Sequence, residues 1–112
     1  MDFFEEIAGD VIVETVNLER GTIKHADKLK QQLVSVIERG FNKIVIDISM
    51  CKFIDSSFLG VLVSILKRTA RMNGDLRLVG FQPAVRSMFE VTRMFRVFDT
   101  FSNTADAVKS FN

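Results

Sequence analysis

The spacing of apolar residues divides the first half of the chain into strands and one helix. Strands are predicted over 3–7 and 11–18, joined by a turn at 8–10, because β-branched residues dominate the second segment. A helix is predicted over 25–39, where apolar side chains recur every three or four positions and a glycine follows. The nearly continuous apolar run 43–48 (KIVIDI) is typical of a strand covered on both faces.

The second half repeats the alternation of helices with strands. Helices are predicted over 57–72, 83–92 and 103–111, and strands over 76–79 and 97–101; Thr22-Ile23 is expected to extend the sheet briefly. Pro83 suits a first helical turn, and Asn103 is placed to cap the last helix. The pattern predicts one α/β domain over 1–112, with a mixed, mostly parallel central β-sheet and about four helices.

Composition removes most catalytic and metal-binding functions. The 112 residues include one cysteine and one histidine, so an internal disulfide and a multi-cysteine metal site are excluded, and no cofactor is expected. No catalytic constellation and no phosphate-binding glycine motif is present, so the chain is not expected to be an enzyme. A net charge of +1 argues against direct nucleic-acid binding.

The chain is also expected to be cytoplasmic and not inserted in a membrane. Its N-terminus, MDFFEEIAGD, is acidic and lacks the order of a signal peptide. The longest apolar-rich run, 58–66, is far shorter than the roughly 20 residues that span a bilayer.

The most informative segment is the helix predicted over 57–72. At about 100° per residue, one narrow polar sector contains six residues: Ser57, Gly60, Ser64, Lys67, Arg68 and Arg71. An exposed serine at a helix start, after a capping Asp55 or Ser56, faces free backbone N–H groups that would tolerate a phosphate. The alternative is that Asp55, Ser56 and Ser57 only cap the helix and that Gly60 only serves packing. The residue chemistry leaves both open.

Three segments resemble the signature of the STAS domain family, and more narrowly that of the bacterial anti-sigma factor antagonists (anti-anti-sigma factors). They are Ile46-Asp47-Ile48-Ser49, Phe53-Ile54-Asp55-Ser56-Ser57 and Leu59-Gly60-Val61-Leu62. The flanks agree, since Gly21-Thr22-Ile23 and the run from Asn73 to Val79 also resemble family patterns. The resemblance covers nearly the whole chain.

The resemblance implies a phosphorylation-controlled binding switch. Such a domain binds an anti-sigma factor that is also a serine kinase, and binding frees the sigma factor. The family's phosphoacceptor maps onto Ser57, with Ser56 as neighbour and Asp55 and Gly60 as supporting residues; a phosphatase would reverse the modification. The expected partner surface comprises Met50, Cys51, Lys52, Ser57, Phe58, Gly60, Ser64, Lys67 and Arg71.

One residue departs from the family pattern. The family usually has Gly or Ala directly after the phosphoacceptor, where this chain has Phe58. Phe58 either packs inward or crowds the approach of the kinase. The alternative function is a STAS adaptor subunit without phosphorylation, such as the soluble component of a bacterial lipid-transport ABC system. Six apolar residues near the C-terminus are expected mostly in the core, and any exposed ones would suit a second contact surface or a homodimer: Met88, Phe89, Met94, Phe95, Val97 and Phe98.

Overall fold

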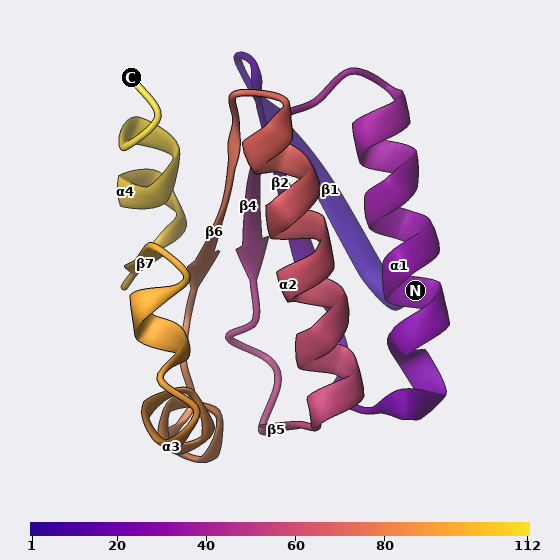
Figure 1. Cartoon of the computed structure of the whole chain (residues 1–112), viewed down its shortest axis with the longest axis vertical. Coiled ribbons are helices and arrows are strands. Elements are labelled where there is room, and N and C mark those ends of the chain that lie inside the picture. Colours follow the sequence, from indigo (N-terminus) through magenta and orange to yellow (C-terminus); the bar gives the residue numbers. More distant parts are fainter.

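A five-stranded mixed sheet, in the order β1-β2-β4-β6-β7, forms the centre of the computed structural model, which describes residues 1–112 (Figure 1). The strands are β1 (Phe3–Ala8), β2 (Val11–Val16), β4 (Lys43–Asp47), β6 (Asp75–Val79) and β7 (Thr100–Phe101). The hairpin of β1 and β2 is antiparallel, and every other pair is parallel. The predicted mixed, mostly parallel sheet is therefore confirmed.

The helices cover the sheet unequally. They are α1 (Ile23–Glu38), α2 (Ser56–Arg71), α3 (Pro83–Val91) and α4 (Thr104–Lys109). Helices α1 and α2 lie side by side on one face and run in the same direction (Figure 1). The main core lies beneath them, where Ile44 and Ile46 of β4 are fully buried. The alternate residue Val45 belongs to a smaller cluster with Ala107 of α4, so α4 covers the opposite face.

Several predicted boundaries were wrong. Thr22 is not in a strand, because its hydroxyl caps α1 by accepting a bond from the N–H of Lys24. Of the strand predicted over 97–101, only Thr100 and Phe101 pair, after a 3-10 turn η1 (Met94–Arg96). Two short strands, β3 (Arg20–Gly21) and β5 (Phe53–Ile54), pair in parallel and were missed, because two residues show no periodicity.

The apolar segment near the C-terminus is mostly core, as expected. Phe89 and Phe98 are buried, and Phe89 packs edge-on against Phe81 with ring centroids 4.9 Å apart. Val97 remains 45% exposed. No helix of the chain combines the length and the apolar character that crossing a bilayer requires.

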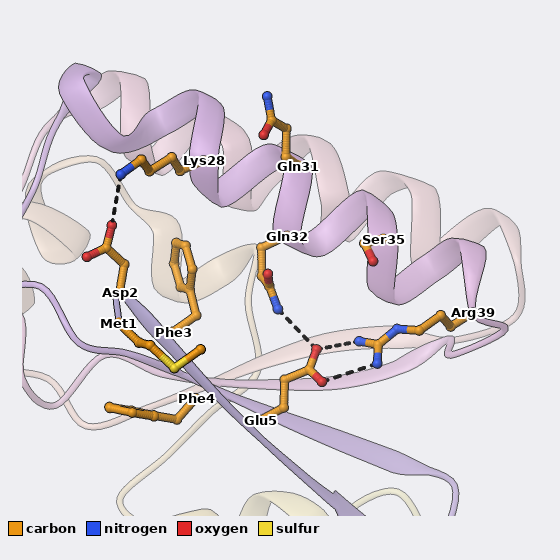
Figure 2. Close-up of a pocket in the computed structure, with 10 residues that line it drawn as sticks. All are labelled: Met1, Asp2, Phe3, Phe4, Glu5, Lys28, Gln31, Gln32, Ser35 and Arg39. Atoms are coloured by element: carbon orange, nitrogen blue, oxygen red, sulfur yellow. Dashed lines mark hydrogen bonds and ion pairs between the residues drawn. The ribbon is translucent and has the colours of Figure 1, made fainter.

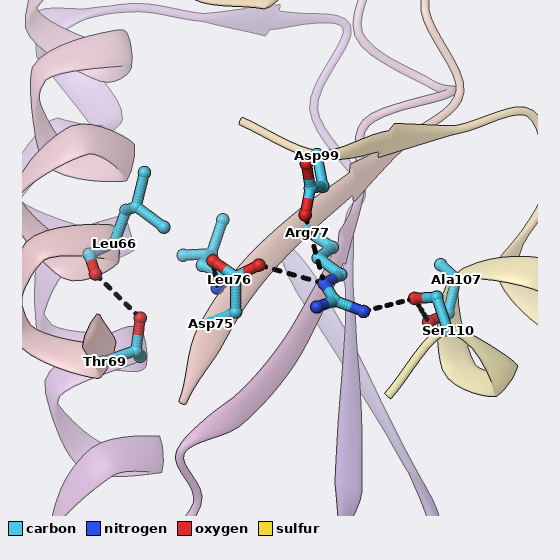
Figure 3. A network of polar contacts seen from close by, with 8 residues as sticks. All are labelled: Leu66, Thr69, Asp75, Leu76, Arg77, Asp99, Ala107 and Ser110. Carbon is cyan, nitrogen blue, oxygen red and sulfur yellow. Dashed lines mark hydrogen bonds and ion pairs between the residues drawn. The ribbon is translucent and has the colours of Figure 1, made fainter. Parts of the chain in front are cut away.

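Polar contacts of Arg77 add to the apolar packing that holds α4 against the sheet (Figure 3). The Nε of Arg77 on β6 donates to Asp75 at 2.9 Å, and its Nη1 donates to the hydroxyl of Ser110 at 2.6 Å. The guanidinium also lies 4.0 Å from the ring centroid of Phe111. Since Asn103 caps α4 through the N–H of Asp106, as predicted, this short helix is fixed at both ends.

We predict that Arg77→Met loosens α4. The charge-assisted bonds to Asp75 and Ser110 are lost together with the stacking on Phe111, so the free energy of unfolding should fall by about 1–3 kcal/mol. Urea unfolding measures the loss, and amide hydrogen exchange should locate it in α4. Arg68→Met, at an exposed position of α2, is the control and should change stability by less than about 0.5 kcal/mol. Equal losses in both variants would contradict this role for Arg77.

Candidate functional site

Asp55 lies where α1 and α2 begin, and its carboxylate caps both helices. Oδ1 accepts a hydrogen bond from the N–H of Phe58 at 2.9 Å, and Oδ2 accepts one from the N–H of Ile23, also at 2.9 Å. The backbone N–H of Asp55 donates to the carbonyl of Gly21 at 2.9 Å. One side chain therefore satisfies free N–H groups of two helix starts that are far apart in sequence.

These donors also determine the charge of Asp55. The N–H of Phe58, supported by those of Ile23 and Ser57, lowers the pKa of the Asp55 carboxyl against a smaller opposing effect of desolvation. The side chain is thus ionised at neutral pH. A negative charge at this point also faces the positive ends of two helix dipoles, which is the favourable arrangement.

Ser56 and Ser57 occupy the first two positions of α2. Ser56 is exposed and Ser57 is half-buried. Beyond them, Gly60, Ser64, Lys67 and Arg71 are all exposed, as the helical spacing predicts. A Cβ added to Gly60 would have no atom within 4 Å, so this glycine fills no packing role inside the chain. The structure brings the polar sector together as one open helix face with Ser57 at its N-terminal end.

Phe58 packs inward, and its placement on the expected partner surface was wrong. Its side chain is fully buried in the main core. It lies against Gly21, where an added Cβ would come within 2.8 Å of Phe58 Cδ2. Gly21 therefore makes room for the ring that follows Ser57. Because the ring turns away from solvent, it does not crowd the approach to Ser57.

Cys51 is also buried, so its placement on the partner surface was wrong as well. Burial, with a contribution from the charge of Asp47, raises the pKa of the Cys51 thiol to about 11. Its neighbours in the loop behave differently: Met50 is 47% exposed, and Lys52 is exposed and pairs with Glu19 at 3.4 Å.

Two exposed apolar residues near Asp55 were not predicted from the sequence to belong to the partner surface. Ile23, whose N–H binds Asp55, is 70% exposed, and Phe53 in β5 is 38% exposed with the guanidinium of Arg20 at 4.5 Å from its ring centroid. Together with Met50 we call them the apolar rim. Ile23 lies between the polar residues Thr22 and Lys24, which could have signalled its exposure, whereas Phe53 directly precedes the buried Ile54 and no such signal was present. No group of three or more His, Cys, Asp or Glu residues lies close enough to hold a metal ion.

Comparison with known proteins gives a consistent match. A family model described as the STAS domain matches residues 22–107. A protein from Thermotoga neapolitana, named as a candidate anti-sigma factor antagonist, is 31% identical over 108 residues, which cover 93% of this chain and 95% of that protein. The crystal structure of a candidate anti-sigma factor antagonist from Thermotoga maritima has a TM-score of 0.87 at 26% identity, covering 96% of this chain and 92% of that one.

Two solved structures of the anti-sigma factor antagonist SpoIIAA, one unphosphorylated and one phosphorylated, share this fold. Its unphosphorylated form gives a TM-score of 0.80 at 18% identity, covering 97% of this chain and 95% of that one. The phosphorylated form, from Bacillus, gives 0.75 at 16% identity, covering 98% and 99%. At these identities the likeness concerns the fold alone.

We predict that Asp55→Ala lowers the free energy of unfolding by about 1–2 kcal/mol at pH 7, because α2 loses its capping side chain and α1, which Thr22 still caps, loses the bond at the N–H of Ile23. The folded-state pKa of Asp55 is lowered, so its contribution is present above its unfolded pKa and disappears as pH falls through the folded pKa. Urea unfolding at several pH values should therefore show the difference from wild type closing in acid. Asp27→Ala, at an exposed position of α1, is the control; an equal loss in that variant would contradict the double cap.

Proposed function

This chain belongs to the STAS domain family, and we propose that it is an anti-sigma factor antagonist whose binding to an anti-sigma factor is switched off by phosphorylation of Ser57. The observation that carries the proposal is the open start of α2, where Ser57 follows the ionised double cap of Asp55; the exposed Ile23 binds the same Asp55, and the exposed Phe53 lies two residues before it. The relatives named as candidate anti-sigma factor antagonists support this partner class.

The binding step uses the apolar rim and the open face of α2. Ile23, Met50 and Phe53 expose apolar side chains that gain free energy when a partner removes them from water. Gly60 and Ser64 are small residues on the exposed face of α2, so a partner backbone can approach this helix closely. Lys67 and Arg71 lie further along the same exposed face and provide the charged edge of the surface. The anti-sigma factor held here is no longer available to the sigma factor.

The switching step adds charge to this surface. A serine kinase, proposed to be the bound anti-sigma factor itself, transfers the γ-phosphoryl group of ATP to Ser57 Oγ; the new O–P bond replaces the bond to ADP, and the hydroxyl proton passes to a base of the kinase. The phosphate brings nearly two negative charges to a surface that binding would desolvate, beside the carboxylate of Asp55. The complex therefore weakens, and a phosphatase restores it.

The folded domain itself is suited to carry the phosphate. The first turn of α2 carries the positive end of a helix dipole, which stabilises an anion at this position, while the N–H of Phe58 is already bound by Asp55. Phe58 and Leu59, the next two residues, are anchored in the core, so the added charge acts on the partner and not on the packing of α2. SpoIIAA, which shares the fold, has been solved in both phosphorylated and unphosphorylated forms.

Phosphorylation is tested with the partner recovered from the source cells. The ATPase that co-purifies with the tagged protein is identified, purified and incubated with the chain and ATP. We expect a mass increase of one phosphate, mapped to Ser57, with none in Ser57→Ala and full modification in Ser56→Ala. Phosphate on Ser56 alone would contradict the assignment of Ser57. Recovery of an ABC-type ATPase with no phosphate transfer would favour the adaptor function instead.

Binding is tested separately by calorimetry with the same purified partner. We expect Ser57→Asp to weaken binding at least about tenfold, equivalent to about 1.4 kcal/mol, because the added carboxylate must be desolvated. Ser57→Ala should retain the affinity of wild type. Ser87→Asp, at an exposed position of α3, is the matched control and should bind normally. Equal affinities for Ser57→Asp and Ser57→Ala would reject the charge mechanism even if Ser57 is phosphorylated.

A further inference from the structure

Two carboxyl groups lie opposite each other in the hairpin of β1 and β2, one on the exposed Glu5 and one on the buried Glu14. In the hairpin of β1 and β2, Glu5 lies directly opposite Glu14, so both side chains point to the same face of the sheet. That face is covered by α1, and Glu14 is only 1% exposed. A glutamate so deeply buried in the middle of a strand is unusual and requires partners.

The partners are Gln32 of α1 and Arg39, which directly follows that helix; Figure 2 shows both beside Glu5. The amide Nε2 of Gln32 lies between the two carboxyl groups and donates to Glu14 Oε1 at 2.9 Å and to Glu5 Oε1 at 3.0 Å. The guanidinium of Arg39 forms a bidentate pair with Glu5. The second oxygen of Glu14, Oε2, is buried and accepts no hydrogen bond.

The charges in this cluster do not balance if both carboxyl groups are ionised. Arg39 is engaged by Glu5, and Lys28 of α1 pairs with Asp2 at 3.4 Å. On the remaining side, β4 presents the apolar Ile46 opposite Glu14. One guanidinium therefore serves two carboxyl groups, and the buried one is better stabilised with a proton than with a charge.

We propose that Glu14 binds a proton which keeps β1 closed against α1, and that loss of this proton in mild alkali releases the N-terminal strand. With the proton present, Glu5 alone is negative and pairs with Arg39. After its loss, two like charges face each other across the hairpin. Because β1 is an edge strand whose residues are mostly exposed, it is the element that can move.

The electrostatics of the two carboxyl groups support this assignment. Burial chiefly, together with the neighbouring Glu5, raises the pKa of Glu14 to about 8, against the lowering effect of Gln32. The hydrogen bond from Arg39 chiefly lowers the pKa of Glu5. Since the folded-state pKa of Glu14 lies above its ordinary value of 4.5, the favourable contribution of the proton is complete below that value and disappears as pH rises to about 8.

The proposal is tested by comparing wild type with Glu14→Gln, which keeps the shape and the hydrogen-bonding capacity of the protonated form. The carboxyl ¹³C resonances of labelled glutamates are followed from pH 4 to 10, and amide exchange in β1 is measured at pH 7 and pH 9. Above the transition, β1 amides of wild type should exchange at least about tenfold faster than those of Glu14→Gln at the same pH. A tenfold change in the opening equilibrium of β1 is the effect that a pKa shift of one unit in Glu14 can produce. Because both proteins are compared at the same pH, the intrinsic base catalysis of exchange affects them equally and cancels in the ratio of rates.

Glu6→Gln is the matched control, because Glu6 is an exposed residue of the same strand. It should leave the alkaline transition of wild type unchanged. Titration of Glu14 near its ordinary value, or identical β1 exchange in wild type and Glu14→Gln at pH 9, would overturn the proposal. If Glu14→Gln does not fold, the titration of Glu14 and the step in β1 exchange in wild type still decide, since both must occur at the same pH.

Discussion

The arrangement of the first turns of α1 and α2 depends on one contact, the double cap formed by Asp55. A helix start leaves backbone N–H groups without partners, and here two helices begin at the same edge of the sheet. Because one carboxylate binds an N–H group of each helix, α1 and α2 run in the same direction and their first turns lie side by side. The first residues of α2, including Ser57, are thereby fixed at the surface, which is the condition for any role of that serine in binding.

The second constraint is the packing that separates the core from the surface at the start of α2. Phe58 is the residue directly after Ser57, yet it is completely buried, because the missing side chain of Gly21 leaves space for its ring. The bulk that interrupts the family pattern in sequence is thus removed from the surface in three dimensions. An added Cβ at Gly60, in contrast, would meet no atom within 4 Å, so the two glycines serve opposite purposes: one admits a core side chain, and the other leaves an open face.

The two notable carboxyl groups show how strongly local structure controls charge. Backbone N–H groups lower the pKa of Asp55, whereas burial raises that of Glu14. Asp55 therefore keeps its negative charge and orders the helices, while Glu14 becomes a group that responds to pH. Neither behaviour follows from residue type, since both side chains carry the same functional group. The first belongs to the proposed binding surface and the second to the hairpin of β1 and β2 at the edge of the sheet.

The sequence by itself determined the fold class, the order of the main elements and the polar face of α2, because these follow from short-range periodicity and from motifs within one segment. It also placed the cap of α2 at Asp55 or Ser56, and the structure shows that Asp55 binds the N–H three residues ahead. Tertiary structure alone decided that Asp55 also caps α1, 32 residues away, and that Phe58 and Cys51 are buried. It likewise decided that Ile23 and Phe53 are exposed and that Glu5 meets Glu14. Each of these depends on which distant segment fills the space beside a residue, and no local pattern encodes that.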